Sequence, residues 1–64
     1  MTLTITIEMN STAFTDTGNG NGHEVRGILR RIARDVDGVI LKEGYETPLE
    51  DYKGNIVGKV VVTS

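Results

Sequence analysis

The chain has 64 residues, a net charge of −2 at pH 7 and no cysteine. This length fits one domain, residues 1–64, near the lower limit for folding without disulfides or metal ions. The missing cysteines exclude disulfides, zinc–thiolate sites and thiol nucleophiles. No run of about 20 apolar residues predicts a transmembrane helix. Because no basic region followed by an apolar core opens the sequence, we expect a cytoplasmic protein.

Residues 2–9 alternate strictly between apolar and polar side chains, which predicts a half-buried strand. Threonines with branched β-carbons suit its wet face. The residues expected to face the core are Leu3, Ile5, Ile7 and Met9.

Residues 10–22 read as a loop. The single phenylalanine of the chain, Phe14, lies in its first part and is expected to pack under the helix or over a sheet edge. Residues 15–22 are rich in glycine and asparagine and are expected to be flexible. Asn21 lies where an N-cap belongs, three residues before Glu24, so a capping box is expected.

Residues 23–36 carry apolar side chains at helical spacing, and this predicts an amphipathic helix whose stripe the rest of the chain covers. The stripe comprises Val25, Ile28, Leu29, Ile32, Ala33 and Val36. Gly38 is the expected stop, and Arg31 is placed to offset Asp35 near the negative end of the helix dipole.

The carboxyl-terminal third predicts a hairpin of residues 49–52 and 56–63 around the turn 53–55. Val60 and Val62 are expected in the core. A bulge at Gly58 would shift the alternation, which leaves the sides of Ile56 and Val57 open. Residues 39–47 fit either a short strand or an apolar lid.

The order of elements predicts an α+β fold, a two-layer sandwich with the chain order β-α-β-β. One helix packs on a three-stranded antiparallel sheet. With the last strand antiparallel to both neighbours, the strand order is 1-3-2.

The sequence resembles a group of small uncharacterised phage and bacterial proteins. Three segments carry the resemblance: an Ala-Phe loop, a helix of the E-x-x-R-I-L-R type and a terminal L-x-D-x-x-G-N-x-V-G hairpin. The matching residues are Ala13, Phe14, Glu24, Ile28, Leu29, Arg30, Leu49, Asp51, Gly54, Asn55, Val57 and Gly58. The chain departs from the group at Arg26 and Gly27, where a better helix former is expected. The resemblance implies an accessory protein of a phage or mobile element and brings no catalytic residues.

The residues supply no catalytic, cofactor-binding or metal-binding set. His23 is the only histidine and is expected to be solvated in the first helical turn. A calcium loop aligned on Asn19 and Asn21 would put Thr17 and Ile28 at the two essential carboxylate positions. The glycines lie too far from the strand for a phosphate cradle, although a helix start can hold an anion weakly.

Four arginines on the helix, together with Lys59, form the candidate interaction surface. We call Arg26, Arg30, Arg31 and Arg34 the arginine face. Three interpretations stay open: a solvated face with local pairing, a site for an acidic protein partner, or a nucleic-acid site. The acidic net charge and the lack of interleaved aromatics count against nucleic acid.

The open face of the sheet is a second candidate surface. It carries Lys59 and the threonines of the first strand, with Val57 and Val61 as further candidates. Exposed strand edges would also permit a homodimer. We therefore expect a non-enzymatic protein, without cofactor, that binds a host protein or protein complex, with inhibition of a host defence complex as the concrete version. The alternative is a small nucleic-acid-binding module that uses the helix arginines.

Overall fold

A computed structural model describes residues 1–15, 18 and 20–64. Residues 16, 17 and 19 of the predicted flexible loop, and with them the calcium-loop alignment, lie outside the described residues. The elements in chain order are β1 (Thr2–Ile7), the 3₁₀ turn η1 (Thr12–Phe14), α1 (Gly22–Val36), β2 (Glu46–Glu50) and β3 (Ile56–Thr63).

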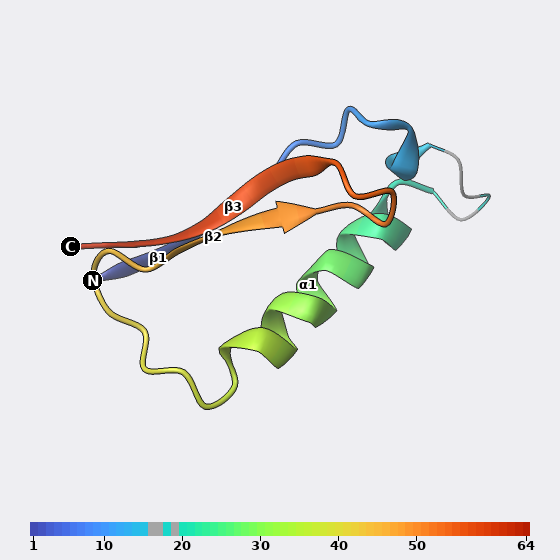
Figure 1. Ribbon diagram of the computed structural model, residues 1–64. Helices are drawn as coiled ribbons and strands as arrows, with labels where there is room; N and C mark the ends of the chain where they lie inside the picture. The colour runs from blue at the N-terminus through green and yellow to red at the C-terminus, as the bar shows by residue number, and fades with distance from the viewer. Residues whose placement is uncertain (16–17, 19) are drawn as a thin grey trace.

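The three strands form one antiparallel sheet in the order β1-β3-β2, and α1 lies on one side of it (Figure 1). The predicted βαββ sandwich and its strand order are confirmed. None of the helices in the described ranges is long and apolar enough to cross a membrane.

The core lies at one end of the sandwich, where η1, the start of α1 and the bulged part of the sheet meet. Phe14 and Ala13 are fully buried there, so the prediction for Phe14 is confirmed. The buried cluster consists of Ala13, Phe14, Ile28, Leu49, Val57 and Val60. With a single phenylalanine in the chain, aliphatic side chains make up the rest of this core.

The sheet covers a narrower strip of α1 than its apolar stripe. Ile28 is buried, and Val25, Ile32 and Val36 are half-buried, but Leu29 is 44% exposed. Ala33 is also exposed. Figure 1 shows the reason: α1 approaches the sheet at its amino-terminal end and separates from it toward its carboxyl end. The expectation that the sheet covers the whole stripe is therefore wrong.

The same divergence exposes part of β1. The register pairs Leu3 with Val62 and Ile5 with Val60, which places these side chains on the helix side of the sheet, as predicted. Leu3 nevertheless stays 41% exposed and Ile5 38% exposed. Of the four residues expected in the core, Ile7 packs against the buried cluster, while Met9 is 47% exposed.

The start of α1 differs from the prediction, whereas its end agrees with it. Asn21 occupies the N-cap position but makes no side-chain capping hydrogen bond, so the capping box is not formed. Glu24 is buried, and its Oε2 accepts a hydrogen bond from the Tyr52 backbone N–H at 2.9 Å. Gly38 follows the C-cap Asp37 with φ +81°, a conformation that glycine adopts without strain, and ends the helix as predicted.

Glu46 and Thr47 belong to β2, and residues 39–45 form neither of the two predicted structures. They connect α1 to β2 irregularly, Ile40 is 89% exposed, and β2 begins at Glu46. Hydrogen bonds between the backbones of Gly44, Tyr45 and Val62 fix the end of this connection to β3. The first strand of the hairpin therefore lies earlier than predicted, and the turn spans residues 51–55.

A bulge in β3 determines on which side of the sheet Ile56 and Val57 lie, a point that the sequence left open. Leu49 pairs with Gly58 and Glu50 with Ile56, so Val57 has no partner in β2. The extra residue reverses the alternation: Val57 is buried and Ile56 is 71% exposed. Gly58 is required here, because a Cβ on it would lie 1.8 Å from the backbone oxygen of Thr6.

Gly58→Ala is expected to lower the free energy of unfolding by about 1–3 kcal/mol or more, because strand backbones must separate to admit the methyl group. For a domain of this size that is a large part of a total of roughly 3–10 kcal/mol. Urea unfolding followed by circular dichroism measures the change.

The matched control is Gly27→Ala, since a Cβ on Gly27 meets nothing within 4 Å. This change is expected to raise the free energy of unfolding by about 0.5–1 kcal/mol through helix propensity. Equal effects of the two substitutions would contradict the close approach of β1 and β3 at Gly58.

Candidate interaction surface

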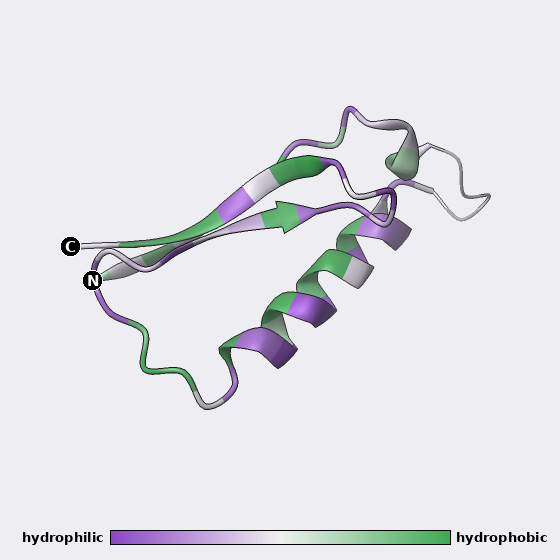
Figure 2. Cartoon of the chain, in the orientation of Figure 1, coloured by the Kyte–Doolittle hydropathy of each residue, from purple (hydrophilic) through white to green (hydrophobic). Residues whose placement is uncertain are grey.

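Two members of the arginine face extend from the side of α1 that faces away from the sheet. Figure 2 shows hydrophilic residues along this side. Arg26 and Arg30 are exposed, and within the described part of the chain neither makes a hydrogen bond or an ion pair. Their guanidinium donors are therefore satisfied by water alone, which leaves them available to a partner.

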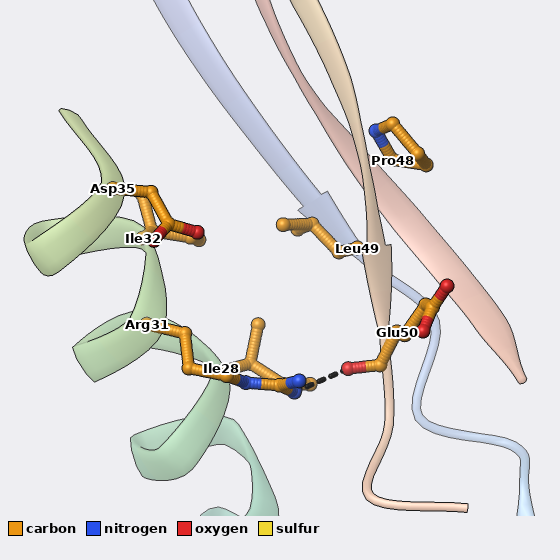
Figure 3. A pocket seen from close by; sticks show the side chains of 7 residues that line it. All are labelled: Ile28, Arg31, Ile32, Asp35, Pro48, Leu49 and Glu50. Atoms are coloured by element: carbon orange, nitrogen blue, oxygen red, sulfur yellow. Dashed lines mark hydrogen bonds between the residues drawn. The ribbon is translucent and has the colours of Figure 1, made fainter. Parts of the chain in front are cut away.

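Arg31 has a structural role instead. Its side chain is half-buried and crosses from α1 to β2, where Nη2 donates a hydrogen bond to the backbone oxygen of Glu50 (Figure 3). The expected pairing of Arg31 with Asp35 is thus not formed. Arg31 therefore connects the helix to the edge of the sheet. Because its guanidinium group is already engaged, it is not one of the free cations of the arginine face.

Arg34 pairs with its neighbour Asp35, with Nε and Oδ1 3.3 Å apart. The two side chains are 74% and 63% exposed, and ion pairs of such exposure contribute about 0–1 kcal/mol. A partner can therefore compete for Arg34 at little cost. Local pairing, one of the open interpretations, applies to Arg34 but not to Arg26 or Arg30.

Apolar side chains lie directly beside the free arginines. Leu29 and Ala33 are exposed, and each lies three positions after one of these arginines, Leu29 after Arg26 and Ala33 after Arg30, so they share the same helix surface. The separation of α1 from the sheet leaves these two side chains uncovered. Arginine next to exposed aliphatic surface is the composition of protein–protein contact sites.

The hairpin turn brings an aromatic residue to the start of α1, which the sequence did not reveal. The Glu24 carboxylate holds the Tyr52 backbone, and the Tyr52 side chain is 58% exposed. Lys53 Nζ lies 5.7 Å from the centre of the Tyr52 ring, a cation–π distance. No sequence pattern signals this proximity, because it depends on the buried Glu24.

Asp51 organises the turn. The residue is 2% exposed, and its carboxylate accepts hydrogen bonds from the Ser11 hydroxyl at 2.7 Å and from the backbone N–H groups of Lys53 and Asn55 at 2.9 Å. The Asn55 side-chain amide adds a bond at 3.2 Å. The sequence signal is the spacing D-x-x-G-N, typical of an aspartate that bonds to its own turn.

These donors lower the pKa of Asp51 from 3.8 to about 2. The Ser11 hydroxyl is the largest cause, the Asn55 and Lys53 donors add to it, and burial opposes it. Asp51 therefore serves as a charged anchor between the turn and the loop after β1. Its hydrogen bonds are all to groups of its own chain, so we assign it no ligand.

Lys59 lies on the other side of the molecule from α1. It pairs in register with Thr6 and Pro48, and its side chain is exposed on the open face of the sheet. The structure does not bring Lys59 together with the arginine face. Val61 lies half-buried on the open face, whereas Val57 points into the core.

A small hollow lies between α1 and β2, with a volume of about 180 Å³. It is lined by Ile28, Arg31, Ile32, Asp35, Pro48, Leu49 and Glu50 (Figure 3). Pockets that enclose small molecules measure about 300–1,000 Å³, so this hollow is too small to hold one. His23 is exposed at the start of α1, and the described residues contain no group of three or more potential metal ligands.

Comparisons with protein-family models, with curated proteins and with solved structures find no match.

The acid stability of the protein is expected to depend on Asp51. Because its pKa is lowered from 3.8 to about 2, the stability that the carboxylate contributes is complete above about pH 4 and is lost as the pH falls toward 2. Asp51→Asn should unfold at a lower temperature at pH 7 and show a shallower loss of stability between pH 4 and 2. Thermal melts across this range measure both effects.

Glu43→Gln is the control, since Glu43 is exposed in the connection before β2. It should melt with the pH profile of the unaltered protein. A profile for Asp51→Asn that runs parallel to that of the unaltered protein from pH 4 to 2 would exclude the anchor role.

Proposed function

We propose that this chain is a non-enzymatic protein that binds an acidic surface of a protein partner through the arginine face. The observation that carries the proposal is that Arg26 and Arg30 are exposed, unpaired within the described residues and one helical turn apart. Arg34 extends the surface by another turn. The occupied Arg31 is left out.

The chemistry of this surface favours carboxylates. A guanidinium group binds a carboxylate with two parallel hydrogen bonds, and two such groups on one side of a helix match acids spaced along a partner. Neither Arg26 nor Arg30 must first release an intramolecular partner. Leu29 and Ala33 add aliphatic area that water leaves on binding, and a partner that covers them strengthens the ion pairs beside them.

Three features of the described residues favour a binding role over a catalytic one. The single histidine is exposed, the Asp51 carboxylate accepts hydrogen bonds from Ser11 and from its own turn, and the hollow beside β2 is too small for a substrate. A general acid–base step needs an oriented partner group within hydrogen-bond reach of the acid or base. The sequence predicts no such partner for His23.

The biological setting follows from the resemblance to small phage and bacterial proteins. In that setting the partner is a host protein or protein complex in the cytoplasm, and inhibition of a host defence complex is the concrete form of the proposal. A domain of 64 residues is large enough to act there by occupying a surface that another molecule needs.

One observation favours the alternative of nucleic-acid binding. The exposed ring of Tyr52 lies at the start of α1, where a base could stack while arginines contact phosphates. Two observations count against it. The net charge is −2, and the residues beside the arginines are aliphatic, so they make no favourable contact with phosphate groups. We therefore rank it second.

The test uses Arg30→Glu in affinity capture from a bacterial lysate, with and without nuclease. A protein partner captured by the unaltered chain should survive nuclease and bind Arg30→Glu about tenfold more weakly or worse, because the reversed charge repels its carboxylates. Quantitative mass spectrometry measures the captured amounts, and circular dichroism verifies the fold.

Lys42→Glu is the control, since it changes the net charge equally at an exposed residue away from α1. It should capture the same partner undiminished. Unchanged capture by Arg30→Glu, with loss in Lys59→Glu, would transfer the site to the open face of the sheet. Partners that disappear with nuclease would replace the proposal by the nucleic-acid alternative.

A further inference from the structure

The outer edge of β1 is open. In the sheet order β1-β3-β2 this strand pairs only with β3, and Thr2 to Thr6 are all exposed, with Ile7 half-buried. No described segment covers the edge: the residues after β1 continue along β3, where the Glu8 backbone N–H donates to the Val57 oxygen at 2.7 Å.

That hydrogen bond fixes the direction of every backbone group in β1. Residues along a strand alternate in the side to which N–H and C=O point. Because Glu8 faces β3, Thr6, Thr4 and Thr2 face β3 too, and Leu3, Ile5 and Ile7 present their backbone groups to the open edge.

The hydrogen bonds on the other side of β3, toward β2, indicate the same orientation of the β1 backbone. The Val62 N–H donates to the Tyr45 oxygen ahead of β2, so Val61 and Lys59 face β1. The register pairs these two residues with Thr4 and Thr6. The two independent hydrogen bonds therefore agree on which groups of β1 are left unpaired.

The two edges of the sheet differ in their protection. The β2 edge contains Pro48, which has no N–H, two glutamates and the Arg31 side chain bound to the Glu50 oxygen. These are the devices that prevent edge-to-edge pairing. The β1 edge reads TLTITI, has no charge or proline, and pairs with β3 without a register shift.

We propose that β1 pairs with β1 of a second copy of this chain, antiparallel about a two-fold axis through Ile5. Ile5 then lies opposite Ile5 of the second copy, and Leu3 lies opposite Ile7 of the second copy. This register uses every outward N–H and C=O of Leu3, Ile5 and Ile7. The two sheets join into one continuous sheet.

The sequence of β1 is complementary to itself in this register. Residues directly opposite each other share a face of the sheet, so aliphatic side chains meet aliphatic ones and threonines meet threonines. No charged side chain lies between Thr2 and Ile7, so no like charges are brought together. Leu3 and Ile5, 41% and 38% exposed in one copy, gain cross-strand neighbours.

A single copy of the chain is more extended than a compact domain of the same length. Its radius of gyration is 12.5 Å, whereas a compact chain of this length has about 11 Å. At the end of the molecule where β1 begins, α1 and the sheet diverge (Figure 1). The pairing leaves the arginine face free on both copies, so it is independent of the function proposed above.

The experiment compares the full chain with Ile5→Pro by sedimentation velocity over a range of concentrations. The unaltered chain should change from its own mass of 7.0 kDa to twice that mass. Ile5→Pro removes an N–H that points outward, so it should keep the fold by circular dichroism and lose the dimer. A mass that stays at 7.0 kDa throughout, or a dimer that persists in folded Ile5→Pro, overturns the proposal.

The register is tested with single cysteines, since the chain has none. Ile5→Cys places its thiol opposite itself, with Cα atoms at about 5.5 Å, and should form disulfide-linked dimers on oxidation. Leu3→Cys is the matched control, on the same face and equally exposed, but it lies opposite Ile7 of the second copy. Equal cross-linking of the two variants overturns the register, and so does stronger cross-linking of Leu3→Cys.

Discussion

The close approach of β1 to β3 at Gly58 is the constraint on which the structure depends. A side chain there would collide with the Thr6 backbone, so the position admits glycine alone. At the same place β3 carries one residue more than β2 can pair. That extra residue turns Val57 into the core and Ile56 out of it. The side chains that this end of β3 contributes to the core therefore follow from this local shift.

The bulge also explains why the core is concentrated at one end. Phe14 from η1, Ile28 from α1 and Val57 from β3 converge on the bulged part of the sheet. The turn that follows β2 is held to the same end by Asp51 through Ser11, and by Glu24 through Tyr52. The two buried acids are thus ties between segments that lie far apart in the sequence.

The sequence predicted the architecture because its strongest signals are periodic. The alternation of residues 2–9, the helical spacing of residues 23–36 and Gly38 identify the elements, and antiparallel geometry then fixes their order. Two of the failures concern features without a period. Residues 39–47 have no repeating pattern, and the burial of Glu24 depends on the Tyr52 backbone, which only the folded hairpin brings near.

The candidate surface was predicted in part for the same reason. The spacing of Arg26, Arg30 and Arg34 places them on one side of a helix, and the structure does so. Which arginine is occupied could not be predicted, because the acceptor for Arg31 is a backbone oxygen at the edge of β2 rather than an acidic side chain. Because every residue has a backbone carbonyl, the sequence does not show which one accepts a hydrogen bond. The apolar partners Leu29 and Ala33 were assigned to the core, since the divergence of α1 from the sheet has no sequence signal either.

The divergence of α1 from the sheet has a consequence for internal motion. The helix is held at its first two turns by buried contacts, whereas its last turns are held by the half-buried Ile32 and Val36 and by the hydrogen bond of Arg31. Local opening requires little free energy where few apolar contacts are broken. Backbone amides near Val36 should therefore exchange with solvent through frequent partial unfolding, while those near Ile28 and Val60 exchange only when the whole domain opens.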